Sequence, residues 1–252
     1  VCLGTDISSR MKNQVLTTVN QCLLNGQVTV SDADGIHPQE RGSRMKKGVR
    51  WVVHDRVGYY FLNKENVILS NQRTEGSWKI ANRQTTTPTD IIQQDVFTLS
   101  VDHGSYPNNE GYAYMVVPSA DPLSIEKQVE EEGVVVLANC PDVQAVRHDG
   151  LNMAYAVFYK GGTLRIHDKI VVEMDAPGML MVKYNDAGEI LTLGVSDPTR
   201  FMKKLHLSVN QRIVGTAQEN IQTEWDGKQA LTRITVELPQ NEYAGKSVIY
   251  NK

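Results

Sequence analysis

Side chains capable of acid–base chemistry are present in this chain, but their spacing does not assemble them into a familiar catalytic pattern. Asp102 and His103 are adjacent and follow an expected strand, so they could form a catalytic pair. The turn-forming run 105–109 comes directly after them, and short polar side chains at such places commonly bond to the backbone of the turn. The favoured interpretation is that a side chain here pins the turn. The other histidines are scattered near turns and strand ends, as structural histidines are: His37, His54, His148, His167 and His206.

Other catalytic and metal-binding patterns are missing from the sequence. It contains no GxSxG, HExxH, GxGxxG or GxxxxGK[ST] motif. The run Asp32–Gly35 is faintly like a calcium loop but lacks the further ligands and the distal Glu, so a solvated loop is favoured. The three cysteines, Cys2, Cys22 and Cys140, have no CxxC spacing and are expected to be core thiols. In an oxidising compartment a Cys2–Cys22 disulfide is conceivable. We expect no catalytic residue, no metal site and no cofactor.

Two features could serve binding to a sugar. Six basic residues cluster in one stretch and could meet a sulfated or uronate-rich glycan through their charged groups: Arg41, Arg44, Lys46, Lys47, Arg50 and Arg56. The favoured alternative is that these basic residues lie on a solvated loop and on the polar face of an edge strand. Trp51, Trp78 and Trp225 could stack on sugars, but Trp51 and Trp78 lie in expected strands with apolar neighbours, which favours burial.

The bulk composition excludes several partners. The chain has 252 residues, a formal net charge of −3, 40% hydrophobic and 22% charged residues. These values are ordinary for a globular protein and give no electrostatic case for a nucleic acid or an anionic membrane. No apolar run approaches the roughly 20 residues that span a bilayer. The residues after Val1–Gly4 are polar, which does not fit a signal peptide, and the chain is expected to be a fragment or a processed piece of a longer protein.

The elements that must position these residues are nearly all strands. Short runs rich in Val, Ile, Tyr and Phe are set off by Gly, Pro, Asn and Asp. Strands are expected at residues 27–30, 49–62 (broken at Gly58), 67–69, 77–80, 96–101, 112–117, 134–137, 154–159, 178–183, 189–195, 204–209 and 231–238. Hairpin turns are expected at residues 186–188 and 226–227.

Helix is expected in few places. A single helix is expected at Ser124–Glu132, with Gly133 placed to end it, and isolated helical turns at Thr89–Gln93 and Asp197–Met202.

This pattern predicts an all-β protein with antiparallel sandwich architecture. The glycine pair at Gly161–Gly162 ends one strand, and the strand spacing tightens after Asp168. We therefore expect two domains, a large sandwich over residues 1–167 and a small sandwich over residues 168–252. The linker between them is short.

The sequence also resembles a known family. The motifs are GSWKIAN at Gly76–Asn82, VDHG at Val101–Gly104, Pro107, and YAY at Tyr112–Tyr114 with Pro118, and they resemble the central β-domain of polysaccharide lyase family 8. Further segments agree with that domain in the same order, namely Leu3–Ile7 with Thr17–Gln21, Trp51–Tyr60, and Val136–Asn139 with Gln144–Val146. The run Val195–Thr199 resembles the small C-terminal domain of the same enzymes.

The resemblance implies an antiparallel supersandwich followed by a small C-terminal sandwich. It also implies an enzyme that cleaves uronate glycans by β-elimination, in which a base removes the C5 proton and an acid protonates the leaving oxygen. In the family these duties fall on residues of an N-terminal α/α toroid and on a Glu in the early central domain. This chain is expected to begin after that Glu, so no catalytic residue is carried over.

Two functional hypotheses follow. In the first, the chain is the scaffold and cleft wall of a lyase acting on chondroitin sulfate, or next on hyaluronan, with the toroid as its partner and a bacterial secreted or periplasmic location. In the second, it is a stand-alone carbohydrate-binding module for acidic polysaccharides. The expected substrate contacts are Trp78, Arg83 and Tyr106, and in the lyase the loops 83–94 and 106–112 could approach the sugar. In the module the contacts would be Trp78, Tyr106 and the basic cluster.

Overall fold

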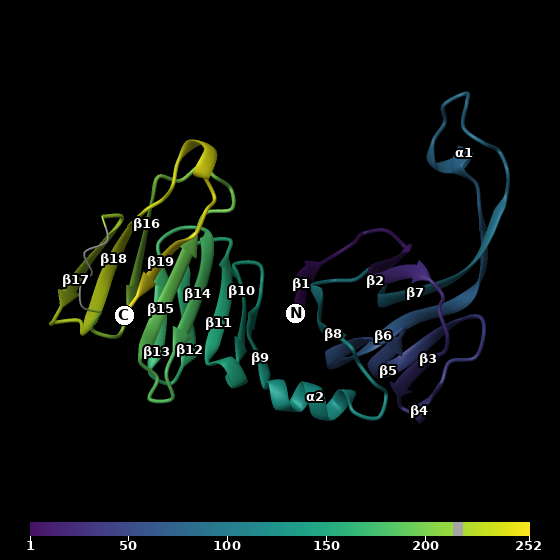
Figure 1. Ribbon diagram of the computed structural model, residues 1–252, viewed down its shortest axis with the longest axis horizontal. Helices are drawn as coiled ribbons and strands as arrows, with labels where there is room; N and C mark the ends of the chain where they lie inside the picture. The colour runs from purple at the N-terminus through teal and green to yellow at the C-terminus, as the bar shows by residue number, and fades with distance from the viewer. Residues whose placement is uncertain (214–218) are drawn as a thin grey trace. The chain divides into compact units, whose positions relative to one another are not determined.

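A computed structural model shows an almost entirely antiparallel β protein (Figure 1). It describes residues 1–213 and 219–252. The chain divides into two compact units, Val1–Lys127 and Gln128–Lys252. The predicted all-β class is confirmed in both units.

The first unit is built on an eight-stranded sheet. Its strands are β1 (Cys2–Ile7), β2 (Gln14–Leu23), β3 (Val28–Asp32), β4 (Gly35–Pro38), β5 (Ser43–His54), β6 (Val57–Gly76), β7 (Ile92–Ser105) and β8 (Glu110–Pro118). The long strand β6 pairs with β5 on one edge and with both β7 and β8 on the other. Its first residues pair with β8 and its last ten with β7, so the sheet forks where those two strands separate. Strand β1 continues the β8 branch and β2 continues the β7 branch.

The core of the first unit lies on one face of this sheet. Tyr59, Phe61, Val67 and Leu69 alternate along β6 and are all buried in it. Period-two alternation of this kind places every second side chain on the same face of a strand. Matching residues come from the neighbouring strands: Val28, Val30, Val49, Val52, Phe97, Leu99, Val101 and Tyr114.

The opposite face of β6 is covered by the segment that leads into α2 (Ile125–Glu132). Ile125 is fully buried, and Trp51, also fully buried, donates its indole Nε1–H to Glu126 Oε1 at 3.1 Å. Gly58 leaves the room for this contact, since a Cβ there would lie 2.5 Å from Ile125 Cδ1. The helix predicted at residues 124–132 is confirmed, and the break in the 49–62 run is a turn at Asp55–Arg56, before Gly58.

Strands β6 and β7 continue beyond the sheet as a two-stranded arm, residues 72–95. Its last pairs run from Arg73 opposite Asp95 to Gly76 opposite Ile92. The one-turn helix α1 (Trp78–Ala81) sits at the tip and buries no residue. Figure 1 shows the arm standing clear of the sheet.

The second unit is a sandwich of two sheets. The six-stranded sheet has the order β19-β15-β14-β11-β10-β9 and the five-stranded sheet the order β12-β13-β16-β18-β17. Their bounds are β9 Val134–Asn139, β10 Val143–His148, β11 Met153–Phe158, β12 Gly162–His167, β13 Ile170–Met174, β14 Gly178–Tyr184, β15 Ile190–Ser196, β16 Lys204–Val209, β17 Ile221–Asp226, β18 Leu231–Glu237 and β19 Val248–Asn251. Short 3₁₀ turns occur at Asp149–Leu151 and Asn241–Tyr243. One continuous core lies between the sheets, with Phe158, Val182 and Ile234 among its buried residues.

The units do not divide where residues 1–167 and 168–252 were expected to part. Strand β12 pairs with β13 across residue 167, and β11 pairs with β14 across it as well. The pair Gly161–Gly162 is a turn that carries the chain from one sheet of the second unit to the other, and a Cβ on Gly161 would lie 2.6 Å from Asp175 O. A glycine pair that ends a strand is compatible with a domain boundary and with a tight turn inside one domain, and here it is the turn.

Some of the turns, helical turns and strands predicted from the sequence are confirmed and others are wrong. The hairpin turns at 186–188 and 226–227 are confirmed, as is the half-buried strand that includes Ile234 and Val236. The helical turns expected at Thr89–Gln93 and Asp197–Met202 are wrong, because the first is loop running into β7 and the second is a non-helical turn. In that second turn, Asp197 accepts bonds from the backbone of Thr199, Phe201 and Met202. The strand expected at 77–80 is wrong too, since α1 occupies it.

Candidate functional site

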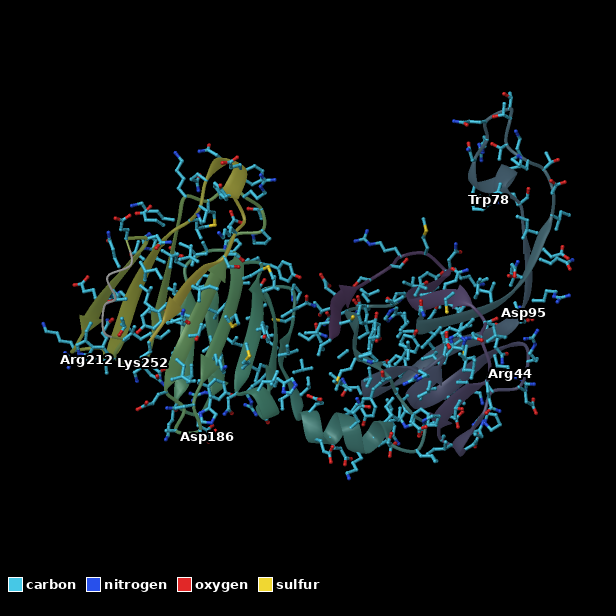
Figure 2. The ribbon with its side chains drawn as sticks, viewed as in Figure 1. Arg44, Trp78, Asp95, Asp186, Arg212 and Lys252 are labelled. Atoms are coloured by element: carbon cyan, nitrogen blue, oxygen red, sulfur yellow. The ribbon has the colours of Figure 1, made fainter. Side chains whose placement is uncertain are left out.

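The tip of the arm is the strongest candidate for a surface that meets a sugar. Trp78 is 61% exposed at the first position of α1, and Arg83 is exposed five residues later (Figure 2). The expectation that Trp78 is buried is wrong, whereas Trp51 is buried as expected; Trp225 is partly exposed on β17. An exposed indole offers an apolar plane, and a guanidinium offers paired donors for a carboxylate or sulfate.

Short-range bonds hold the tip in shape. Ser77 Oγ accepts from Lys79 N at 3.3 Å and so caps α1, and Lys79 Nζ donates to Gln84 O at 2.6 Å. Asn82 closes the turn through its backbone N–H to Trp78 O at 2.8 Å. An N-cap Ser satisfies a backbone N–H that a helix of this length otherwise leaves open. The tip is therefore an ordered turn that presents Trp78 beside two cationic residues.

Tyr106 lies in the turn between β7 and β8. It has φ 54° and is 55% exposed. The left-handed region is unfavourable for a bulky residue, and such outliers concentrate at functional sites. The turn is held by Asn109 N, which donates to Ser8 Oγ at 3.0 Å, and by Ser9 N, which donates to Pro107 O at 3.0 Å.

The three expected contact residues do not form one site. Trp78 and Arg83 share the arm, next to the start of β7, whereas Tyr106 follows the end of that strand. A strand of this length spans about 40 Å at 3.2–3.4 Å per residue. One sugar unit cannot touch both places, so a glycan that meets all three must be long.

Asp102 pins its turn. Its Oδ1 accepts from Gly104 N at 2.9 Å. His103 turns to another strand, with Nε2 2.8 Å from Thr17 Oγ1, and its burial lowers its pKa. The favoured interpretation of this pair is confirmed, and no Asp–His hydrogen bond joins the two side chains among the described contacts.

In the basic stretch at residues 41–56, four of the six cations are paired with carboxylates, Arg50 with Glu126 at 4.0 Å among them. Arg41 pairs with Asp95 at 2.8 Å and Arg44 with Glu40 at 2.6 Å. Lys46 pairs at 3.1 Å with Asp32, whose side chain is almost completely buried and also lies 3.1 Å from His37 Nε2. Exposed cations already paired with carboxylates offer little net field to a polyanion. This geometry supports the solvated-edge interpretation.

Cys2 and Cys22 are partly buried against the core of the first unit, but Cys140 is exposed, so the expectation of core thiols is wrong for Cys140. All three cysteines are free, so no Cys2–Cys22 bridge is formed. Cys22 Sγ lies 3.7 Å from His54 Nδ1, but burial raises the pKa of Cys22 and lowers the pKa of His54. The pair therefore stays a thiol and a neutral imidazole, which is not a nucleophile pair. His54 stacks on Phe97 at 4.3 Å between centroids and accepts from Asn25 N.

One ionisable group was missed by the sequence analysis. Glu65 lies in the middle of β6, where β7 and β8 separate, and burial together with the Glu110 carboxylate raises its pKa to about 7. No local signal marks it, because Glu110 is distant in the sequence and only the forked sheet brings the two carboxyls into range. Across the described ranges, 1–213 and 219–252, no group of three or more His, Cys, Asp or Glu side chains could hold a metal ion.

Comparison with known families decides the identity of this fold. The family model of the polysaccharide lyase family 8 super-sandwich domain matches residues 1–129, and that of the family's C-terminal beta-sandwich domain matches residues 135–206. The chain belongs to polysaccharide lyase family 8. The matches part close to the structural boundary between the two units. They also assign the segments 136–139 and 144–146 to the C-terminal domain, so the expectation that these segments belong to the central domain is wrong.

Relatives in the family share both units. The chain is 33% identical to the chondroitinase-AC of Pedobacter heparinus over 248 residues, which is 98% of this chain and 33% of that protein. It is 26% identical over 211 residues to a xanthan lyase of a Bacillus species, covering 79% of the chain and 22% of that protein. A solved chondroitinase AC lyase superposes on 99% of the chain with a TM-score of 0.80 and 32% identity, covering 34% of that structure. The chain thus spans about a third or less of these family 8 proteins. Among the described residues, no helix is long and apolar enough to cross a membrane.

Proposed function

We propose that the chain forms the C-terminal β-domains of a family 8 lyase that cleaves a uronate glycan by β-elimination. Chondroitin sulfate is the favoured substrate, with hyaluronan next. The proposal rests on family membership across both units together with the absence, among the described residues, of an assembled acid–base group. The relative with 33% identity is a chondroitinase-AC, which favours chondroitin.

In this proposal the chain supplies support and a cleft wall, and the reactive groups lie in an N-terminal α/α toroid of the same protein. β-Elimination needs a neutralised uronate carboxylate, a base for the C5 proton and an acid for the leaving oxygen. The histidines of the chain do not offer these in one place, because His54 is buried against Phe97 and His103 bonds to Thr17. A bacterial secreted or periplasmic location goes with this function.

The first test is activity of the chain alone. Purified residues 1–252 are expected to leave chondroitin sulfate and hyaluronan intact, while the full-length protein generates the ultraviolet absorbance of the unsaturated product. Appearance of that absorbance with the chain alone, at a rate proportional to its concentration, would show that reactive groups reside in these two units.

The second test concerns the wall. In the full-length enzyme, Trp78→Ala and Arg83→Ala are each expected to lower kcat/KM on chondroitin sulfate by about tenfold, the effect of losing one stacked ring or one charge-assisted bond worth about 1.4 kcal/mol. Ile80→Ala is the matched control, because Ile80 is exposed on the same helical turn but has no sugar-binding group. Equal kcat/KM for Trp78→Ala, Arg83→Ala and Ile80→Ala would remove the arm from the substrate site.

A stand-alone carbohydrate-binding module is the second candidate. The exposed Trp78 beside Lys79 and Arg83 favours it, since this is sugar-binding chemistry that needs no catalytic group. The chain alone would then be retained on a chondroitin sulfate column at moderate salt, and Trp78→Ala would release it. Elution in the void volume, with the full-length enzyme retained, supports the scaffold role.

A further inference from the structure

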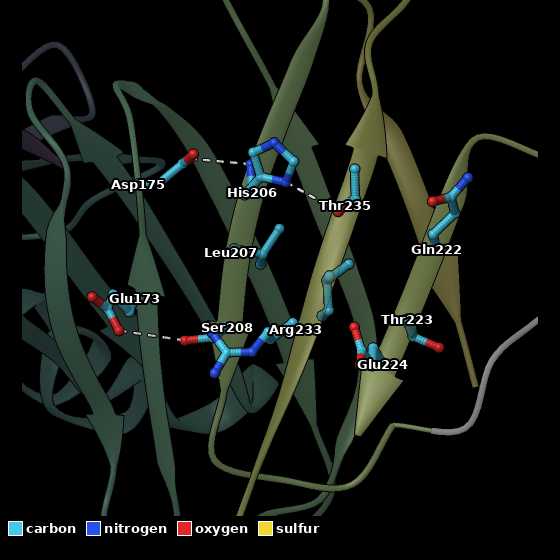
Figure 3. A pocket seen from close by; sticks show the side chains of 11 residues that line it. Glu173, Asp175, His206, Leu207, Ser208, Gln222, Thr223, Glu224, Arg233 and Thr235 are labelled. Carbon is cyan, nitrogen blue, oxygen red and sulfur yellow. Dashed lines mark hydrogen bonds between the residues drawn. The ribbon is translucent and has the colours of Figure 1, made fainter. Parts of the chain in front are cut away.

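The outer face of the five-stranded sheet in the second unit carries a groove that is lined by none of the residues considered for the lyase function. It has a volume of about 540 Å³ and crosses strands β13, β16, β18 and β17 (Figure 3). The face lies away from the sandwich core, because the alternate residues Leu207 and Ile234 of the same strands are buried.

Strand register arranges the polar side chains of this groove in two rows. In one row Glu173 is opposite Ser208, Ser208 opposite Arg233, and Arg233 opposite Glu224. In the next row His206 is opposite Thr235 and Thr235 opposite Gln222, and Asp175 Oδ1 accepts from His206 N at 3.1 Å. Four adjacent strands are about 14 Å across at 4.7–4.9 Å spacing, and the rows lie about 7 Å apart. The resulting grid suits the length of a short oligosaccharide.

Much of the hydrogen-bonding capacity of the grid is unused. Glu224 and Gln222 make no side-chain hydrogen bond to a described residue, and Glu173 receives only a 3.5 Å contact from Ser208 Oγ. Arg233 uses one nitrogen, Nη2, for Asp226 and Gln229. Carboxylate and amide acceptors that no described residue occupies therefore lie beside a guanidinium donor. Sugar hydroxyls both donate and accept, so they can use both kinds of group at once.

The charge of the groove selects against the polyanion that the lyase cleaves. Glu173, Asp175 and Glu224 contribute three carboxylates, against which the lining sets one permanent cation, Arg233, and the imidazole of His206. A sulfated or uronate-rich chain would be repelled at this surface. Arg233 is itself paired with Asp226 at 3.1 Å, so the carboxylates leave the lining acidic, and a lysine-rich peptide is the competing ligand that the titration must exclude. A neutral, hydroxyl-rich ligand fits the hydrogen-bonding grid, because its hydroxyls can use the acceptors and the Arg233 donor together.

We propose that this groove of the C-terminal sandwich binds a neutral, hydroxyl-rich glycan, as a non-catalytic subsite separate from the elimination reaction. Glu224 and Gln222 on β17 accept hydrogen bonds from sugar hydroxyls, Arg233 donates hydrogen bonds to ring or hydroxyl oxygens, and Glu173 lies at the opposite end of the row. Such a subsite would bind the enzyme to a neutral glycan that lies close to its acidic substrate.

The test is calorimetric titration of the full-length protein with cellohexaose, maltohexaose, a hexamer of N-acetylglucosamine, a chondroitin sulfate hexasaccharide and a lysine-rich peptide. At least one neutral hexasaccharide is expected to bind. The double variant Gln222→Ala/Glu224→Ala is expected to weaken that binding about tenfold or more, because it removes the Glu224 carboxylate and the Gln222 amide from one edge of the groove. Both residues are exposed, so fold is expected to survive, and an unchanged thermal transition checks this.

Arg165→Ala is the matched control, since Arg165 is exposed on β12 of the same sheet but outside the groove. Lyase activity on chondroitin sulfate is measured in the same preparations and is expected to be unchanged in both variants, which separates this proposal from the proposed function. The proposal is overturned if no neutral hexasaccharide binds, if the double variant binds as well as Arg165→Ala, or if the lysine-rich peptide or the chondroitin hexasaccharide is the ligand that the double variant loses.

Discussion

Tyr106 holds a backbone conformation that stores free energy in a turn. Its φ of 54° lies in the left-handed region, where a residue with a Cβ pays roughly 1–2 kcal/mol relative to the right-handed region. The turn is held from outside by Ser8 and Ser9, so the strain persists. Burial of the Tyr106 side chain does not offset this strain, because the side chain is 55% exposed. This combination of strain and exposure is the reason to test Tyr106 as a contact residue.

Replacing Tyr106 with glycine tests this argument. Tyr106→Gly is expected to leave the free energy of unfolding unchanged or to raise it by about 1 kcal/mol, because relief of the strain exceeds the entropy cost of glycine. Tyr155→Gly, at an exposed tyrosine in the middle of β11, is the control and is expected to lose about 1 kcal/mol. Urea denaturation of both variants measures the difference. A similar loss at the two positions would mean that the Tyr106 side chain is structural.

Glu65 links stability to pH at the fork of the sheet. Its ordinary pKa of 4.5 is raised to about 7 in the folded chain by burial and by Glu110. Between these two pH values the unfolded chain releases this proton while the folded chain keeps it. The contribution of Glu65 to stability is therefore full below about pH 4.5 and falls as pH rises to about 7.

Glu65→Gln removes the group that titrates. The variant is expected to be more stable than the parent at pH 8 by about 1 kcal/mol, after allowance for solvent screening of a partly exposed carboxyl, and to be no more stable at pH 4. Denaturant midpoints at the two pH values measure this, with the exposed Glu75→Gln on the arm as control. An equal shift at both pH values would point to packing instead of ionisation.

At the scale of elements, the contact between β6 and the segment before α2 depends on one missing Cβ. A Cβ on Gly58 would lie 2.5 Å from Ile125 Cδ1 and 2.8 Å from Ala120 Cβ. Gly58→Ala is therefore expected to destabilise the chain by about 1–3 kcal/mol, the usual cost of overpacking a full core. Gly76→Ala, with no atom within 4 Å of its new Cβ, is the control. Thermal denaturation measures both, and Ile125→Val should restore part of the loss. Failure of that rescue would place the cost of Gly58→Ala elsewhere.

The elements that were predicted correctly are those whose structure depends on residues close to them in the sequence. The alternation of Arg233, Ile234, Thr235 and Val236 is local, and it gives both the strand and its buried face. The helix at 125–132 has apolar residues one turn apart and a glycine stop, which are also local signals. Such patterns identify the element directly, because a period of 2.0 residues is that of a β-strand and a period of 3.6 residues is that of an α-helix.

Elements decided by distant contacts were not predictable in the same way. The run Ser77–Ile80 contains Trp and Ile and was expected to form a strand, yet at the tip of the arm no neighbouring strand is present, and the Ser77 cap favours a helical turn. The same error hid the exposure of Trp78, the best member of the candidate site. The interaction between Glu65 and Glu110 could not be predicted from the sequence either, because only the fork between β7 and β8 brings the two carboxyl groups close to each other.

At the scale of the whole molecule, the second unit encloses its core between two sheets of its own. Strands β9, β10 and β11 come before residue 168 and strands β14, β15 and β19 after it, and together they form the six-stranded sheet. Buried residues of both sets, such as Ala156 and Leu180, share the same core. Because a sandwich is stable only when both inner faces are covered, the unit should fold as one piece from residue 128 onward.

Two truncated chains test that boundary. Residues 128–252 are expected to unfold in a single cooperative thermal transition, because all pairings of β9–β19 are retained. Residues 168–252 are expected to show none and to aggregate, since they lose β9–β12, expose the edge of β14 that pairs with β11, and open the core around Val182. The two chains share every residue from 168 onward, so the comparison isolates those four strands and the turns between them. Circular dichroism against temperature gives the result. A cooperative transition in residues 168–252 would show that the tightly spaced hairpins after Asp168 are a domain in their own right, as their spacing in the sequence had predicted, and that the pairing of β11 with β14 joins two domains.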